Sequence, residues 1–185
     1  MREKGFTLIE LVVVIVILGT LAVVAAPRFL NMSQDAHESA ANGIFSAFRS
    51  GLSLFEASCV MNGGDSVITG GQASDHLLVQ IEGVTAAAIG TCYPASSGTP
   101  DGRTSDFADC LQIWEGVLSN SPSYNTSSIT ISDANLIEAA ESFDVVVAYG
   151  SGWGQCDFYY VASRQGLNSP VLNYDSENGT LERQN

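Results

Sequence analysis

The chain begins with a short polar segment that is followed by an unbroken apolar run. The run extends from Phe6 to Ala26, and Glu10 is its only charged residue. As a helix, these residues would extend about 31 Å, which matches the hydrocarbon core of a bilayer, about 30 Å. The pattern therefore predicts a membrane-spanning helix. Arg2 and Lys4 precede it and Arg28 follows, a small bias that favours a cytoplasmic N-terminus and an exported remainder.

After Pro27 the pattern changes to one apolar position in every three or four. The apolar stripe consists of Ala36, Ala40, Ile44, Phe48, Leu52, Phe55 and Cys59. This spacing places the stripe on one face of a helix. We therefore expect one helix of some 54 residues, from Phe6 to about Cys59. Its weakest stretch is Gly19 to Pro27, because glycine is a poor helix former and proline lacks the amide hydrogen.

Short β-branched or aromatic segments, separated by turn residues, occupy the rest of the chain. Residues 66–69 and 77–81 are candidates for short strands or turns. The predicted strands are 128–131, 143–149 and 157–162, and a last hairpin pairs 171–174 with 180–182. We expect residues 91–110, rich in Pro, Gly, Ser and Asp, to form a long loop and 111–118 to form a short helix. An antiparallel sheet packed on the apolar stripe would bury one face of each. The pattern therefore predicts an α+β fold.

Composition and charge narrow the classes of function. Apolar residues make up 45% of the 185 residues, which excludes a disordered chain. The chain has 7 basic and 20 acidic residues, for a formal charge of −13. Nucleic-acid binding needs a basic patch, so this balance argues against a nucleic-acid partner.

Four cysteines suit two disulfides in an oxidising compartment. They are Cys59, Cys92, Cys110 and Cys156, with no Cys-x-x-Cys pair, and the chain has only two histidines. This argues against a zinc site, and the sequence identifies no base for a catalytic thiol. Four cysteines permit three pairings, and sequence alone does not choose among them. We favour Cys59–Cys92 with Cys110–Cys156, because the second bridge then ties the long loop to a late strand.

Other motifs are better explained as turns. The glycine-rich segment Gly150 to Gly154 superficially resembles a dinucleotide loop, but no helix follows, so a β-turn is the better interpretation. Asp175, Glu177 and Asn178 carry oxygens that calcium could use, but their spacing misses the EF-hand loop and favours a polar hairpin turn. No carboxylate pair, Ser-His arrangement or phosphate-cradling loop stands out. We therefore expect no enzyme, no cofactor and no metal.

Glu10 is the unusual residue of the apolar run. A carboxylate at mid-helix in a membrane costs roughly 2.5 to 3.5 kcal/mol, and somewhat less near an end. One interpretation places Glu10 at the headgroup boundary, where the cost is small. Another requires a positive group at the same depth. Cleavage after Gly5 would supply one, because Phe6 would gain an α-amino group with a pKa of about 8, able to pair with Glu10 of a neighbouring subunit.

The segment Gly5-Phe-Thr-Leu-Ile-Glu-Leu-Val12 resembles the prepilin cleavage and methylation motif of type IV pilins and of the pseudopilins of type II secretion. The longer segment from Phe6 to Asn31, above all Ala-Ala-Pro-Arg-Phe-Leu-Asn, is similar to the mannose-sensitive haemagglutinin (MSHA) branch of pilins. The resemblance implies that Gly5 ends a leader peptide and that Phe6 becomes the N-methylated first residue. It also implies that Glu10 guides assembly and that a prepilin peptidase cuts and methylates the chain.

The same resemblance implies a ladle-shaped fold and a division of the chain. Residues 1–5 would be the leader, 6–26 the transmembrane or filament-core half-helix, 27–60 the amphipathic half-helix and 61–185 the head. The stretch Gly19 to Pro27 would be able to lose helicity in a filament, as in similar pilins. A secretory signal cleaved near Ala22, Ala25 or Ala26 is the alternative for the N-terminus.

We expect a structural subunit of an MSHA-like pilus that serves attachment. It would wait in the inner membrane with its head in the periplasm, and then join a fibre on the cell surface. Its partners would be copies of itself, other pilins, the prepilin peptidase and a surface receptor. The alternatives are a pseudopilin of a type II secretion system and a minor tip pilin that acts as an adhesive binding module.

Overall fold

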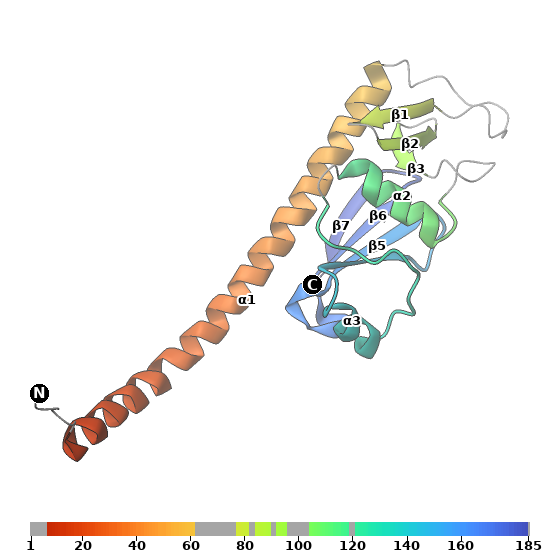
Figure 1. The fold of residues 1–185 in the computed structure, drawn as a ribbon. Coiled ribbons are helices and arrows are strands. Elements are labelled where there is room, and N and C mark those ends of the chain that lie inside the picture. The colour runs from red at the N-terminus through yellow and green to blue at the C-terminus, as the bar shows by residue number, and fades with distance from the viewer. Residues whose placement is uncertain are drawn as a thin grey trace, which may run out of the picture. The chain divides into compact units, whose positions relative to one another are not determined.

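The computed structural model describes residues 7–61, 77–81, 84–89, 92–95, 104–118 and 121–184. The chain forms two compact units, residues 1–39 and 40–185, which are described separately. A single helix, α1 (Leu8–Met61), supplies nearly all of the described part of the first unit and continues into the second (Figure 1). Its bounds agree with the helix expected from the sequence.

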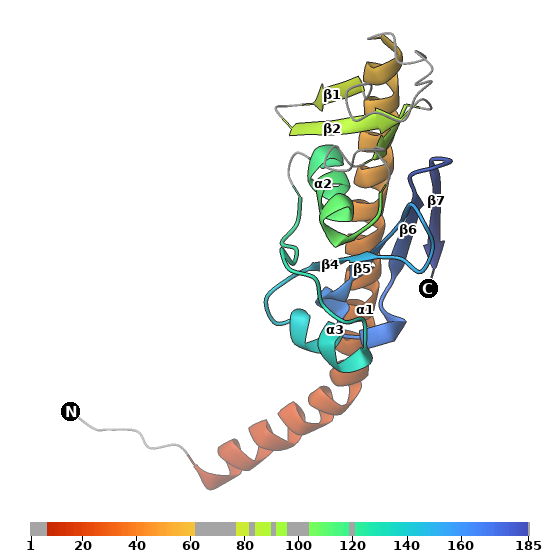
Figure 2. The same cartoon turned by 90° about the vertical axis from the view of Figure 1, so that its right-hand side faces the viewer.

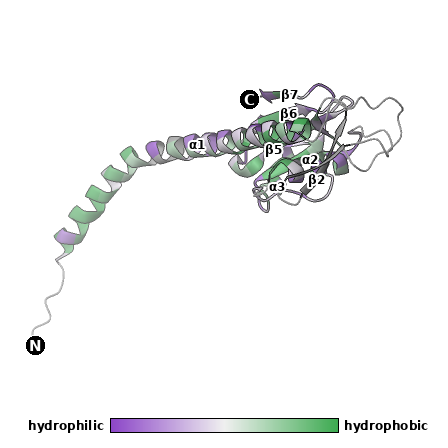
Figure 3. Cartoon of the chain, turned by 90° about the horizontal axis from the view of Figure 1, so that it is seen from above, coloured by the Kyte–Doolittle hydropathy of each residue, from purple (hydrophilic) through white to green (hydrophobic). Residues whose placement is uncertain are grey.

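The first unit is dominated by the apolar part of α1. The window Leu8–Ala25 has a mean hydropathy of 2.9 and none of it is buried. Within the described part of the chain, this is the one helix long and apolar enough to cross a membrane. Figure 3 shows the apolar colouring over this part of the helix. The backbone is helical at both Gly19 and Pro27.

The second unit contains a four-stranded antiparallel sheet. Its strands are β4 (Val145–Tyr149), β5 (Gln155–Tyr160), β6 (Val171–Asp175) and β7 (Thr180–Gln184), in that order across the sheet. Phe158 lies opposite Val147 on one side and Leu172 on the other. Because side chains alternate along a strand, Phe158 and Leu172 share one face with Tyr174, and this face is buried.

An aromatic core joins this sheet to α1. Phe48 of α1 is fully buried, and its ring centroid lies 5.5 Å from that of Trp114, 5.0 Å from that of Phe158 and 5.9 Å from that of Tyr174. The helix also buries Ala41, Phe45, Leu52, Phe55 and Cys59. The predicted stripe is therefore the buried face from Phe48 onward. Ala36 and Ala40 are exposed, a correction, because burial of α1 begins at Ala41.

Helix α2 (Phe107–Val117) lies between the four-stranded sheet and a second, three-stranded sheet (Figure 2). The second sheet is antiparallel and consists of β1 (Leu77–Ile81), β2 (Val84–Ile89) and β3 (Tyr93–Ala95). At Gly51, α1 comes so close to α2 that an added Cβ would lie 2.3 Å from the carbonyl oxygen of Val117. Glycine is therefore required at this helix contact.

A second, smaller core covers the other face of β4. Helix α3 (Asp133–Ala139) contributes Leu136, which packs with Val146 of β4 and with Val161 in the short 3₁₀ helix after β5. Ile129 and Ile131 pack against the same cluster. The outer face of β4 is therefore buried.

The α+β prediction is confirmed, with corrections in the connections. Residues 128–131 form no strand, because Ile129 and Ile131 find apolar partners at α3 without pairing with another strand. Residues 91–110 are not all loop, since they include β3 and the first turn of α2. The described strands form two sheets where one was expected. The strand or turn predicted at 66–69 lies outside the described residues.

Candidate functional site

The start of α1 carries a hydrogen-bonded pair, Thr7 and Glu10. Oε2 of Glu10 accepts hydrogen bonds from the backbone N–H of Thr7 at 2.9 Å and from its hydroxyl at 2.8 Å. In return, the backbone N–H of Glu10 donates to Oγ1 of Thr7 at 3.3 Å. This reciprocal arrangement is a capping box, which satisfies amide groups that the first turn of a helix would leave unbonded.

The capping box gives Glu10 a role within its own chain, which sequence reasoning missed. The signal was present, since Thr7 and Glu10 have the Thr-x-x-Glu spacing that precedes apolar helices. Thr7 engages one carboxylate oxygen, Oε2, and a carboxylate can accept several hydrogen bonds. The cap therefore orients Glu10 and is compatible with a further cationic partner. Gly5 and Phe6, the predicted cleavage positions, lie outside the described residues.

Exposed apolar side chains lie before and after Glu10, on every side of the helix. Leu8 is 80% exposed and Val23 is 77% exposed, and the large aliphatic residues between them are exposed as well. A helix that is apolar all round is normally buried in a membrane or in the core of a larger assembly. This half of α1 therefore requires either lipid or other protein chains.

Comparison with known proteins bears on this segment. Residues 1–26 match the prokaryotic N-terminal methylation motif. Over 54 residues the chain is 44% identical to the "type IV narrow pilus major component PilA5" of Thermus thermophilus. That match covers 29% of this chain and 47% of the relative, so the chain spans about half the length of the curated relative it matches. The motif and this relative support the type IV pilin family. No solved structure matches the chain.

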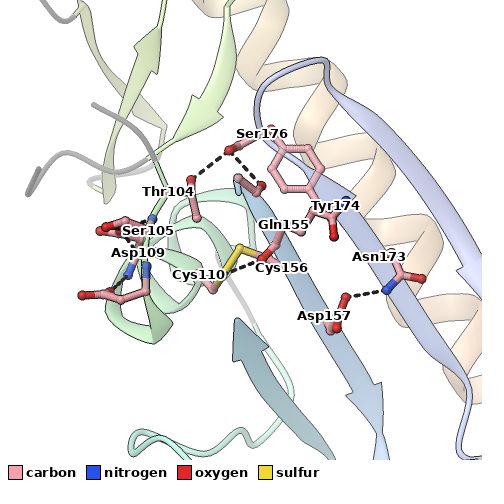
Figure 4. The surroundings of a disulfide bond; sticks show 12 residues. Thr104, Ser105, Asp109, Cys110, Gln155, Cys156, Asp157, Asn173, Tyr174 and Ser176 are labelled. Atoms are coloured by element: carbon pink, nitrogen blue, oxygen red, sulfur yellow. Dashed lines mark hydrogen bonds between the residues drawn. A yellow bond between two sulfur atoms is a disulfide. The ribbon is translucent and has the colours of Figure 1, made fainter. Parts of the chain in front are cut away.

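Two disulfides hold the second unit, in the pairing favoured from the sequence. Cys59–Cys92 ties the end of α1 to the start of β3, and Cys110–Cys156 ties α2 to β5 (Figure 4). The bridges close segments with sequence separations of 33 and 46 residues. By loop-closure entropy each would stabilise the fold by about 4 kcal/mol. All four cysteine sulfurs therefore serve in structural disulfides.

Buried polar contacts connect the hairpins around the second disulfide. The hydroxyl of Ser176 lies 2.9 Å from Oγ1 of Thr104 and 3.0 Å from the carbonyl oxygen of Gly154 (Figure 4). The hydroxyl of Tyr174 donates to the carbonyl oxygen of Pro94 at 2.9 Å, which links β6 to β3. Burial, aided by nearby acidic groups, raises the pKa of Tyr174 well above its ordinary value, so the phenol stays neutral and donates. The Tyr174 contact therefore ties the two sheets together.

The candidate calcium ligands form a turn. Oδ1 of Asp175 accepts from the backbone N–H of Glu177 at 2.8 Å, and its Oδ2 accepts from the side chain of Asn178 at 2.9 Å. The side-chain oxygen of Asn178 accepts from the N–H of Thr180 at 2.9 Å. In the described part of the chain, no group of three or more His, Cys, Asp or Glu side chains is placed to hold a metal ion.

Proposed function

We propose that this chain is the structural subunit of a type IV pilus, MSHA-like in kind, which serves attachment to surfaces. The observation that carries the proposal is the apolar window Leu8–Ala25 of α1, none of which is buried and which needs lipid before assembly and other subunits afterwards. The methylation motif supports the proposal, and so does the similarity to a protein described as a major pilus component.

Maturation would proceed at the N-terminus. A prepilin peptidase would cut between Gly5 and Phe6 and methylate the new α-amine of Phe6. Removal of residues 1–5 takes away two basic residues and one acidic residue, so the formal charge would change from −13 to −14. Before assembly the chain would sit in the inner membrane with its head in the periplasm, where the two disulfides can form. Afterwards it would lie in a fibre at the cell surface.

Glu10 would act between subunits as well as within its own. The Thr7 cap holds its carboxylate near the start of the helix, at the depth where cleavage would create the amine of Phe6. In apolar surroundings a charge is stable only when paired, so Glu10 would neutralise the amine of a neighbouring subunit. This pairing would set the register of one helix against the next.

Glutamine at position 10 separates the two roles of Glu10. Gln preserves the capping box, because an amide oxygen can accept the Thr7 hydrogen bonds, but it removes the negative charge. We expect E10Q to be inserted in the membrane and to assemble poorly. The T7A variant is the matched control, since it loses both hydrogen bonds of the Thr7 hydroxyl and keeps the charge. Wild-type fibre yield from E10Q would refute the proposed pairing.

Intact-mass spectrometry of fibres sheared from cells tests the proposed maturation. The expected mass lacks residues 1–5, carries one methyl group and lacks four hydrogens for two disulfides. Cells without the peptidase provide the control, in which the uncut chain should stay in the membrane. Fibres built from chains that retain residues 1–5 would contradict the proposal.

Deletion of the coding gene separates pilus from pseudopilus. We expect surface fibres and attachment to be lost while protein secretion continues. Loss of secretion with intact surface fibres would instead identify a type II pseudopilin. Labelling along the whole fibre is expected for a major subunit, and labelling at the tip alone would identify a minor adhesive pilin.

The stretch from Gly19 to Pro27 would change between the two states. It is helical here, and an added Cβ at Gly19 would meet nothing within 4 Å. We propose that this stretch loses helicity when the chain enters a filament. Hydrogen exchange should then be faster over residues 19–27 in fibres than in detergent-held monomer, and equal protection in both states would overturn this.

A further inference from the structure

The outer face of β5, β6 and β7 forms an open groove on the head. Its volume is about 550 Å³, and its lining includes Gln155, Asp157, Asn173, Asp175, Glu182 and Gln184. Side chains alternate along these strands, so the groove lies on the opposite face of the sheet from the aromatic core. This face is exposed along β7 and partly covered at Tyr159 of β5, which packs against the cluster at α3.

The lining of the groove suits a cation. It contains three carboxylates, Asp157, Asp175 and Glu182, and no basic residue. Asn173 donates from Nδ2 to Oδ1 of Asp157 and holds that carboxylate in place. Burial nevertheless raises the pKa of Asp157, because a half-buried carboxylate loses hydration of its charged form. An incoming cation would relieve this cost, whereas an anionic ligand would be repelled.

Two arginines line a hollow on the other side of the same sheet edge, Arg183 of β7 and Arg49 of α1. The guanidinium of Arg183 in β7 lies 6.0 Å from the ring centroid of Phe45 and donates from Nη1 to Oδ1 of Asn42. Arg49 lines the same hollow of about 180 Å³ between α1 and the sheet. The chain has only seven basic residues, and two of them line this one hollow. The hollow is therefore complementary in charge to the acidic groove.

We propose that the acidic groove of one head binds the Arg49 and Arg183 hollow of a second copy. Guanidinium groups match carboxylates in geometry and remain charged at all relevant pH values. The contact would also reduce repulsion between subunits that each carry a strongly negative charge. The proposal rests on the filament function proposed above, because it specifies how heads meet in that filament.

The two surfaces are placed so that the same contact can repeat from one copy to the next. Glu182 and Arg183 are neighbours in β7, so their side chains point to opposite faces of the sheet. A copy that offers its arginines to one neighbour therefore keeps its groove available for another. A contact between two different patches builds an open polymer when the rotation that relates successive copies does not close a ring.

Charge exchange tests the contact in fibres of the full chain. We expect E182R and R49E each to raise the subunit concentration needed for assembly by about tenfold, because like charges would then face each other. The double variant E182R/R49E should recover most of the loss. E141R makes the same charge change at an exposed position after α3 and should assemble like wild type. Single variants that behave like E141R would overturn the proposal.

Cross-linking tests the contact without disrupting it. R49K would give the mature chain its only lysine, because Lys4 leaves with the leader. R49K/E182Q is produced together with wild type, and the mixed fibres are treated with a carbodiimide, which joins amines to carboxylates. A peptide joining position 49 to Glu182 can then arise only between two copies. This product is expected in fibres, and cross-links to carboxylates outside the groove alone would overturn the proposal.

The outcomes separate this contact from the function it rests on. If wild type forms no fibre, the proposed pilus function fails. If wild type forms fibres and neither the cross-link nor the charge rescue occurs, this contact alone fails. Spermine serves as a free polycation. Binding of spermine that E182R abolishes, together with unchanged assembly of E182R, would show that the groove takes an external cation and would overturn the contact between copies.

Discussion

The close approach of α1 and α2 leads to opposite predictions for two glycines of one helix. Gly43 and Gly51 both lie inside α1, where alanine is favoured over glycine by about 1 kcal/mol. An added Cβ at Gly43 meets nothing within 4 Å, so G43A should stabilise the fold by about that amount. An added Cβ at Gly51 would lie 2.3 Å from the carbonyl oxygen of Val117 and 2.8 Å from its Cγ1.

The contact at Gly51 outweighs the helix propensity. Overpacking costs about 1–3 kcal/mol, and the upper end applies because a backbone carbonyl cannot rotate away as a side chain can. We therefore expect G51A to lower the free energy of unfolding by about 2 kcal/mol after the gain in propensity is subtracted. For a chain of this length this corresponds to a fall of about 4–8 °C in Tm, against a rise of about 2–4 °C for G43A.

Thermal unfolding of both variants in detergent, followed by circular dichroism with the disulfides intact, measures the difference. Wild type and the G43A/G51A double variant complete the set. The two sites have no described contact in common, so their effects should add. If G51A were as stabilising as G43A, the packing of α1 against α2 described above would be wrong.

Three further predictions concern the core, the second disulfide and the groove. F48A should lower the free energy of unfolding by about 3–5 kcal/mol, because a fully buried ring with three aromatic neighbours is lost. The control L54A, at an exposed position, should change it by less than about 0.5 kcal/mol. Urea unfolding measures both. C110A/C156A should cost about 2–5 kcal/mol in the same assay, and an unchanged midpoint would show that the bridge contributes nothing. Burial raises the folded-state pKa of Asp157, so the stability linked to this carboxyl is present in acid and lost as pH rises through its folded pKa. D157N removes this loss and can keep the Asn173 hydrogen bond. The Tm difference, D157N minus wild type, should therefore increase from about pH 3 to about pH 6. A difference that stays constant over this range would contradict the assignment.

Features that depend on neighbouring residues were readable from the sequence. The apolar run, the change of period after Pro27 and the end of the helix all follow from local patterns, and α1 occupies Leu8–Met61 as expected. The sequence signal of the capping box at Thr7 and Glu10 also lies within a few consecutive residues, although it was not recognised. Residues 107–110 were assigned to a loop, yet Asp106 and Asp109 form a capping box that begins α2 there. Local signals were therefore sufficient at these places, even where they were overlooked.

Tertiary structure decided what depends on partners distant in the chain. The β-branched residues Ile129 and Ile131 suggested a strand, but a strand needs a pairing partner, and α3 supplied an apolar surface instead. The alanine-rich segment Val84–Ile89 lacked a strand signal and is held in the sheet by its neighbours.

The sequence by itself determined a long helix with an apolar first half, a cysteine count that suits two bridges and a strongly acidic surface. It could not place Glu182 with Asp157, or Arg183 with Arg49, because those positions are brought together only by the register of β5 to β7 and by the packing of α1 on the sheet. Side-chain periodicity is a property of a few consecutive residues. A groove and its complement are properties of segments that meet only when the chain has folded.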